Sequence, residues 1–281
     1  MREYPETQIA HIETSVNPFA PLRRAWAHRA LVSALVRREL SARYRGGTLG
    51  FLWSFLNPLL LLLVYATVFR FVFAPRADVR PYALFLFGGV LLWGFASAAL
   101  IDAAECFRSN GPLLRKTTVS PEVFPAAAVG ARLSHFVLAF PVLVAAIVYA
   151  ALRGSVRLGA AALEFPLVLA LLTLAVFGAA LGISALSVHF GDVRDLVGNL
   201  LTLAFFLTPV LYPAEAVPAR WRWALRLNPF SSFFDGLHDT LFAFRPVPAE
   251  DWLWMAFVAA AALAVGGAIF ERLRDSLAEE A

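Results

Sequence analysis

Several kinds of residue are scarce in this 281-residue chain, and each shortage excludes a class of protein. Charged residues make up only 16%, against about 25% in a typical soluble domain, while 60% are hydrophobic. One cysteine, Cys106, excludes an internal disulfide and a cysteine-rich metal site. The phosphate-binding loop G-x-x-x-x-G-K-[ST] needs a lysine, but Lys116 is the only one and follows Arg115 instead of glycine. The composition therefore predicts a polytopic membrane protein without its own ATP site.

Long apolar runs fill most of the chain. From Leu49 to Phe73 the side chains are almost all apolar, apart from Ser54, Asn57, Thr67 and Arg70. About 20 residues at helical rise cross the roughly 30 Å of hydrocarbon in a bilayer. This stretch therefore predicts a transmembrane helix with a basic flank on its N-terminal side.

Hydropathy predicts six such helices, so the expected fold class is an all-α polytopic membrane protein. Residues 1–48 are expected to form a cytosolic tail and an amphipathic helix at the membrane surface, followed by a transmembrane domain over 49–275. The expected spans are about 50–73, 82–105, 123–152, 162–188, 194–213 and 251–272.

Arginine and lysine residues gather on one side of these spans. Most of the 24 lie before the first span or in the connections on the same side of the membrane. The positive-inside rule then places both termini in the cytoplasm. Because the arginines flank apolar spans, the net charge of +4 does not indicate a nucleic-acid partner. The polar, arginine-rich segment Met1–Gly47 does not resemble a cleavable signal peptide.

The segment Ala25–Arg45 has the pattern of one amphipathic helix. Two surfaces fit it: the bilayer, with arginines toward anionic head groups, or a soluble partner. Polar residues recur every fourth position on one face, at Arg29, Ser33, Arg37, Ser41 and Arg45.

The cytoplasmic connection Phe107–Val123 is longer than a simple link between helices requires. Asn110-Gly111-Pro112 predicts a turn, and Leu113–Lys116 a short amphipathic piece. Ser120-Pro121-Glu122 has the residue types of a helix N-cap and first turn.

The outer connection Pro213–Glu250 contains a second apolar segment that is not a simple span. Phe230–Phe244 is apolar but carries Asp235 and Asp239, and charges at mid-bilayer cost about 2.5–3.5 kcal/mol each on insertion scales. Irregular backbone at membrane depth must be sheltered by protein. Two re-entrant half-helices are therefore expected, one near Ala219–Leu227 and one within Phe230–Phe244.

Four charged or titratable residues fall near the inner ends of predicted spans. Asp102 and Glu105 belong to the second span, and Arg132 and His135 to the third. Such groups face a partner or water inside a membrane protein. They either pair across adjacent helices or line an entrance for an anionic lipid-linked substrate.

Four segments, in this order, resemble the type-2 ABC-transporter permeases that export polysaccharides. The departure from the family pattern is Phe190-Gly191-Asp192, where the family usually has an aromatic residue and arginine directly before the aspartate. The segments are RYRGGTLGFLWSFLNPLLLLLVYATVF from Arg43, the basic loop Phe107–Val123, the turn Ser187–Asp195, and Phe205–Pro213 with Val217-Pro218 and Leu225–Phe230 after it.

The resemblance implies a transport subunit in the bacterial inner membrane. Two copies would form a channel and pair with two separate ABC ATPase subunits, which bind the ATP and Mg²⁺, so this chain needs no cofactor. The implied substrate is a lipid-linked polysaccharide such as O-antigen, capsule or teichoic acid. The alternatives are a type-2 exporter of a lipid or drug, an intramembrane enzyme and a passive channel. Against a serine protease, Gly182-Ile183-Ser184-Ala185 is followed by Leu186, where the motif G-x-S-x-G needs glycine.

The resemblance also assigns candidate site residues. Ordinary alternatives exist for each group: a basic loop that only sets topology, and phenylalanines that only face lipid. The residues for coupling to the ATPase are Leu113, Leu114, Arg115, Lys116, His189, Asp192 and Arg194. Those for the channel and outer gate are Phe205, Phe206, Thr208, Pro209, Tyr212, Trp223, Asn228 and Asp235. Those for the interfacial substrate entrance are Arg37, Arg43, Tyr44 and Arg45.

Overall fold

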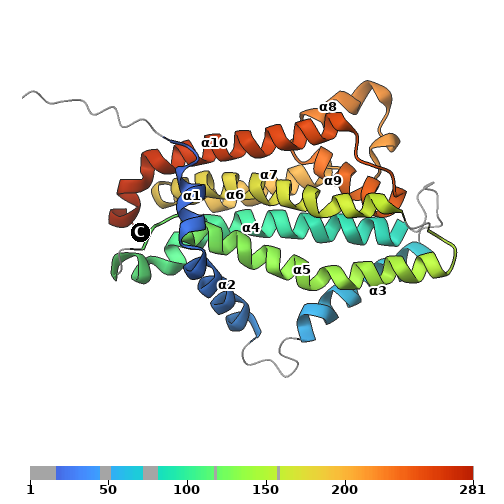
Figure 1. Cartoon of the computed structure of the whole chain (residues 1–281), viewed down its shortest axis with the longest axis horizontal. Helices are drawn as coiled ribbons and strands as arrows, with labels where there is room; N and C mark the ends of the chain where they lie inside the picture. Colours follow the sequence, from blue (N-terminus) through green and yellow to red (C-terminus); the bar gives the residue numbers. More distant parts are fainter. Residues whose placement is uncertain (1–16, 45–51, 72–81, 117–118, 157–158, 281) are drawn as a thin grey trace, which may run out of the picture.

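The computed structural model describes residues 17–44, 52–71, 82–116, 119–156 and 159–280, and the regular structure in these ranges is helical (Figure 1). The expected all-α fold is therefore confirmed. The helices are α1 (Ala20–Ala27), α2 (Arg29–Tyr44), α3 (Trp53–Phe71), α4 (Tyr82–Lys116), α5 (Val123–Leu152), η2 (Ala160–Glu164), α6 (Phe165–His189), α7 (Val193–Leu207), η3 (Ala214–Ala216), η4 (Ala219–Trp221), α8 (Arg222–Leu227), α9 (Ser231–His238), η5 (Asp239–Ala243) and α10 (Ala249–Glu280).

Four of the described helical segments are long and apolar enough to cross a membrane, judged by length and composition. Helix α3 contributes a shorter apolar stretch, Phe55–Val68. The four segments are Tyr82–Gly111, Val123–Leu152, Ala160–His189 and Ala249–Leu277.

Helix α4 is the central helix of the bundle and runs beside α5 and α6 (Figure 1). Small and large apolar residues on α4 are fully buried, among them Phe87, Leu92, Ala96, Ala99 and Ala103. Inside a bilayer such helices associate through van der Waals packing, because lipid tails are as apolar as these side chains, and this tightly packed face of α4 forms the centre of the core.

Glycines permit the closest helix contact, between α6 and α10. A Cβ atom on Gly266 would overlap the carbonyl oxygen of Gly178, and one on Gly178 would overlap the backbone at Ala262. Small residues allow two backbones to approach in this way inside membrane bundles. The pair therefore sets the spacing of two helices that are expected to cross the membrane.

Helix α4 continues through the predicted turn at Asn110-Gly111-Pro112, and that prediction was wrong. The helix runs for 35 residues to Lys116. Proline removes only the hydrogen bond that its missing N–H would donate to the carbonyl of Arg108, an exposed residue that water can solvate. The Asn110 side-chain amide does not form a turn; it donates to the Cys106 carbonyl, one helical turn earlier, at 2.9 Å.

Helix α7 is shorter than the predicted span 194–213. It ends at Leu207 after 15 residues, and Thr208 adopts an extended conformation. The reason is Pro209, because a residue before proline is disfavoured in the helical region. At 1.5 Å per residue α7 is about 22 Å long, which is less than the hydrocarbon thickness.

The N-terminal region forms two helices instead of the single helix predicted over Ala25–Arg45. Helix α1 ends at Ala27, His28 separates the two, and α2 starts at Arg29. Helix α2 packs on α5 of the same chain, with Leu35 buried. Helix α1 crosses the bundle at the end where α10 finishes (Figure 1). We call this the α1 end, and the opposite end, where α8 and α9 lie, the α9 end.

Candidate coupling and gate regions

The residues predicted to dock an ATPase lie at the α1 end. Leu113–Lys116 form the last turn of α4, but their side chains lie outside the described residues. The turn between α6 and α7 reaches the same end (Figure 1). Its Phe190 is 58% exposed, and Asp192 at the start of α7 is also exposed. The fold therefore brings the two predicted coupling segments to one end of the bundle.

Two predicted coupling residues are also tied to neighbouring helices. Arg194 of α7 forms an ion pair with Glu105 of α4, with Nε 2.9 Å from Oε1. The His189 Nε2 lies 3.0 Å from the Ser276 hydroxyl of α10. The residues around the α6–α7 turn therefore contact both α4 and α10.

The α1 end contains a charge network that the sequence analysis did not identify. Arg24 of α1 forms ion pairs with Glu122, just before α5, and with Glu271 of α10. Arg274 of α10 lies 3.9 Å from the second Glu122 oxygen. Glu122 is fully buried, while the Arg24 side chain is 27% exposed. The spacing of Glu271 and Arg274 near the end of an apolar helix was a usable signal for such a network.

Asp102 and Arg132 pair across α4 and α5, which was one of the two alternatives left open. The Arg132 Nη2 donates to Asp102 Oδ1 at 2.7 Å, and Nε contacts the other carboxylate oxygen. Glu105 pairs with Arg194. These charges are thus paired between helices, as membrane-embedded charges commonly are.

The α9 end joins two predicted gate residues that are twenty positions apart in the sequence. The Asn228 side-chain amide donates to the Thr208 hydroxyl at 2.9 Å and to the Leu207 carbonyl at 3.1 Å. Its oxygen accepts from the Phe230 backbone N–H at 3.0 Å. Asn228 therefore connects the C-terminal end of α7 to the start of α9. Pro209 is buried beside this junction.

Aromatic rings form a cluster around Trp93 of α4, which the sequence analysis did not select. Ring centroids of Phe205, Phe230 and Phe234 lie 5.8, 5.5 and 5.9 Å from it. Phe205 therefore packs in the protein. Its neighbour Phe206 is 62% exposed.

The two remaining aromatic gate residues lie on the surface side of this end. The Tyr212 hydroxyl donates to the Phe206 carbonyl at 3.0 Å, which folds the segment after α7 back on the helix. Trp223 on α8 is largely exposed. Short helices lie in the two residue ranges predicted for the half-helices, η4 with α8 in the first and α9 with η5 in the second; their re-entrant character stays a prediction.

Acidic residues surround one arginine beside α9. The Arg245 Nε donates to Asp239 at 2.7 Å, and Nη2 lies 3.2 Å from Glu215. The Ser232 hydroxyl donates to Asp251 at 3.2 Å. Burial raises the pKa of Asp235 to about 7, with Asp251 and Asp239 adding to the effect.

The buried His238 lies in the same turn of α9 as Asp235. Its ring stacks on Phe85 of α4 with centroids 3.7 Å apart. Burial lowers the pKa of His238 to about 3, so the imidazole is neutral at physiological pH.

The predicted entrance residues belong to α2 and to the segment after it. Arg37 is exposed on α2. The side chains of Arg43 and Tyr44, at the end of α2, and all of Arg45 lie outside the described residues. The neighbouring Arg38 donates to the Asn110 side chain at 2.5 Å, which connects α2 to the last turns of α4.

Comparison with known proteins identifies the family to which the chain is similar. The ABC-2 type transporter family matches residues 30–242. The chain is 34% identical to an O-antigen export system permease protein, RfbA, of Myxococcus xanthus, over 92% of this chain and 98% of that protein. It is 27% identical to an RfbA of Klebsiella pneumoniae over 89% and 94% of the two chains. A capsule polysaccharide export inner-membrane protein, CtrC, of Neisseria meningitidis is 32% identical over 31% of this chain and 32% of that protein.

Proposed function

The chain belongs to the ABC-2 type transporter family, and we propose that it is the membrane-spanning subunit of an ATP-driven exporter of lipid-linked polysaccharide. The observation that carries this proposal is the 34% identity to an O-antigen export permease over nearly the full length of both chains. A second supporting observation is that two predicted coupling segments lie at one end of the bundle and the predicted gate at the other. The expected location is the bacterial inner membrane.

In this proposal a separate ABC ATPase subunit binds at the α1 end and supplies the energy. The last turn of α4 and the exposed α6–α7 turn are the docking surfaces. Arg194 and His189 transmit the movement, because they contact α4 and α10 respectively. ATP and Mg²⁺ would bind only to the ATPase subunit.

The proposed topology has six spans, with the α1 end and both termini on the cytoplasmic side. Helix α3 supplies one further span, and α7 together with the extended segment after Leu207 supplies the other. Helices α8 and α9 form a re-entrant pair at the outer face. The burial of Phe233, Phe234 and Leu237 in α9 supports this, because a sheltered half-helix needs protein around it.

The proposed assembly is a homodimer of this chain with two ATPase subunits. Exposed leucines form a stripe along α7 at helical spacing, which suits a helix that faces a second copy and not the core of its own bundle. Their exposed fractions lie between 55% and 64%, at Leu196, Leu200, Leu203 and Leu207. The glycan would pass between the two copies. Arg37, Arg43, Tyr44 and Arg45 would meet the anionic lipid-linked substrate at the entrance.

Deletion of the gene for this chain tests the proposal in the source bacterium. We expect the polysaccharide to disappear from the cell surface and to accumulate on its lipid carrier inside the cell. Reintroduction of the wild-type chain is expected to restore surface polysaccharide. Normal surface polysaccharide in the deletion strain, together with the loss of export of another lipid or a drug, would favour the alternative type-2 exporter.

A further inference from the structure

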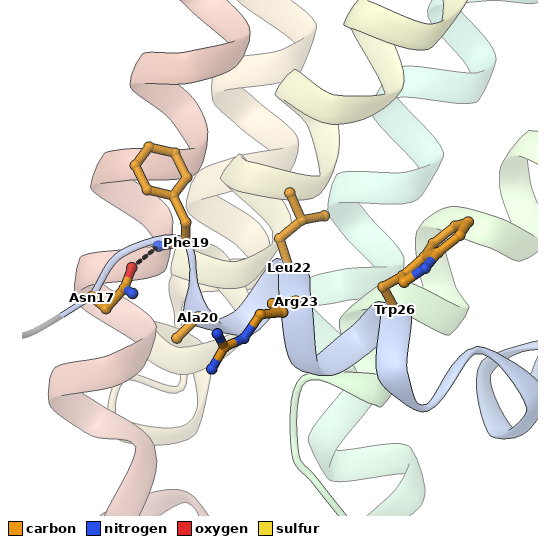
Figure 2. A pocket seen from close by; sticks show the side chains of 6 residues that line it. All are labelled: Asn17, Phe19, Ala20, Leu22, Arg23 and Trp26. Atoms are coloured by element: carbon orange, nitrogen blue, oxygen red, sulfur yellow. Dashed lines mark hydrogen bonds between the residues drawn. The ribbon is translucent and has the colours of Figure 1, made fainter.

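Helix α1 carries a groove that the proposed export function does not use. Phe19, Leu22 and Trp26 lie along one side of the helix and form most of its apolar lining (Figure 2). Trp26 is 71% exposed and Phe19 49%. The Asn17 side chain accepts the Phe19 backbone N–H at 3.1 Å and fixes the start of this surface. Large apolar rings at such exposure indicate a ligand or an apolar environment.

The orientation of α1 is fixed by contacts on both sides of the groove. Pro18 packs directly on Gly267 of α10, where a Cβ atom would overlap the Pro18 carbonyl. Arg24 pairs with Glu271, one turn further toward the C-terminal end of α10. Leu22 and Trp26 are each two residues from Arg24 and therefore about 200° around the helix from it. The groove thus faces back along the bundle, toward the apolar middle of the spanning helices.

Cations border the groove. Arg23 lines it and is exposed. The Arg29 guanidinium lies 5.8 Å from the Trp26 ring centroid. From Asn17 to Arg38 the chain contains five arginines and no acidic residue. Apolar rings on the bilayer side and guanidinium groups at the level of the head groups match a lipid with an acyl chain and a negative phosphate.

We propose that this groove binds an anionic phospholipid of the leaflet at the α1 end. One acyl chain packs on Phe19, Leu22 and Trp26, and the phosphate lies between Arg23 and Arg29. A soluble protein would not reach this surface, because it faces away from the bundle end. Since Arg24 connects α1 to Glu122, the bound lipid also stabilises the start of α5 beside the proposed docking site.

The test uses the full chain with benzoylphenylalanine at position 19, in nanodiscs of phosphatidylethanolamine, phosphatidylglycerol and the lipid-linked glycan. After illumination we expect phosphatidylglycerol adducts enriched about fivefold over its fraction in the bilayer. At about 1.4 kcal/mol per factor of ten, that enrichment corresponds to about 1 kcal/mol in total. Raising the salt concentration is expected to reduce the enrichment while both arginines are still present. This part of the test therefore does not depend on whether an arginine variant folds.

Substitution gives the second part of the test. Arg23→Gln with Arg29→Gln is expected to return the adducts to the bilayer composition. Arg220→Gln, an exposed arginine on η4 at the other end, is the matched control and is expected to change nothing. Adducts that match the bilayer composition in the wild type would contradict the proposal. Adducts mainly to the lipid-linked glycan, or to a second protein chain, would also overturn it and assign the groove to substrate or to an interface.

Discussion

Buried charged side chains determine much of how the helices contact one another at the α1 end. Glu122 is fully buried; one of its carboxylate oxygens is hydrogen-bonded to Arg24 of α1, and the other lies 3.9 Å from Arg274 of α10. Removal of one partner from a buried ion pair costs about 3–5 kcal/mol, because the other charge stays buried. For this reason Arg24 is the residue at which a small change is expected to have a large structural effect.

We predict that Arg24→Met destabilises the chain by about 3 kcal/mol, at the low end of that range because Arg24 is partly exposed. The double variant Arg24→Met with Glu122→Gln is expected to recover a large part of this loss. Thermal unfolding in detergent measures both, with Arg220→Gln as control. Equal stabilities for wild type and the Arg24 variant would show that the network is not needed to seat α1.

A second residue-scale prediction concerns pH at the α9 end. Helix α9 lies outside the four long spanning helices, and the groups facing Asp235 are Asp239, Asp251, Glu215 and Arg245. The folded-state pKa of Asp235 is about 7, above the unfolded value, so its contribution to stability is present below about pH 4 and is lost as the pH rises to 7.

Asp235→Asn is therefore expected to be more stable than wild type at pH 8, with the difference shrinking toward pH 4. His238 acts in the opposite direction, since its lowered pKa makes its contribution present above about pH 6.5 and lost as the pH falls. Because His238 is present in both proteins, the difference in stability between wild type and Asp235→Asn isolates the contribution of Asp235. Asp195→Asn, an exposed site on α7, is the matched control. A difference that is constant with pH would contradict the assignment.

At the scale of helices, the contact between α6 and α10 depends on glycine. We predict that Gly266→Ala destabilises the chain by about 1–3 kcal/mol, because the added methyl group meets the backbone of Gly178. Gly94→Ala on α4 is the matched control. Its Cβ meets nothing within 4 Å, so this change is expected to be neutral or slightly stabilising. Equal effects of the two changes in thermal unfolding would exclude a specific close approach.

At the same scale, the presence of the long helices was predictable from the sequence, whereas the positions of some helix ends were not. The long apolar runs of α4, α5, α6 and α10 were predictable, since hydrophobic length alone determines a span. The end of α7 and the continuation of α4 through Pro112 were not, because they depend on which carbonyls find another donor or water. The proline residues alone do not distinguish these two outcomes.

At the scale of the whole molecule, the proposed topology places α8 at the outer face of the membrane. Trp223→Cys, in a Cys106→Ala background, is expected to react with an impermeant thiol reagent added to intact spheroplasts. Trp223 is largely exposed, whereas Cys106 is buried. A cysteine at exposed Asp192, at the α1 end, is expected to react only after the membrane is opened. The reverse pattern would invert the topology.

The sequence predicted separate coupling and gate segments, and the fold places these segments at opposite ends (Figure 1); the contacts within each end were only partly predictable. Thr208 and Asn228 were selected for their place in proline-containing motifs, and the fold joins them. Arg24, Glu122 and Trp93 were not selected, because their roles arise from contacts between helices far apart in the chain. Such contacts depend on the tertiary fold, and the spacing of Glu271 and Arg274 near the end of α10 was the local signal that pointed to one of them.

The most direct test of the account is glycan transport in proteoliposomes that contain this chain and its ATPase subunit. We predict ATP-dependent movement of labelled lipid-linked polysaccharide across the membrane, and none with either protein alone. Replacement of Leu113, Leu114 and Arg115 by aspartate is expected to abolish transport while the chain remains inserted. Transport by this chain without the ATPase, or ATP hydrolysis by both proteins with no movement of the polysaccharide, would contradict the account.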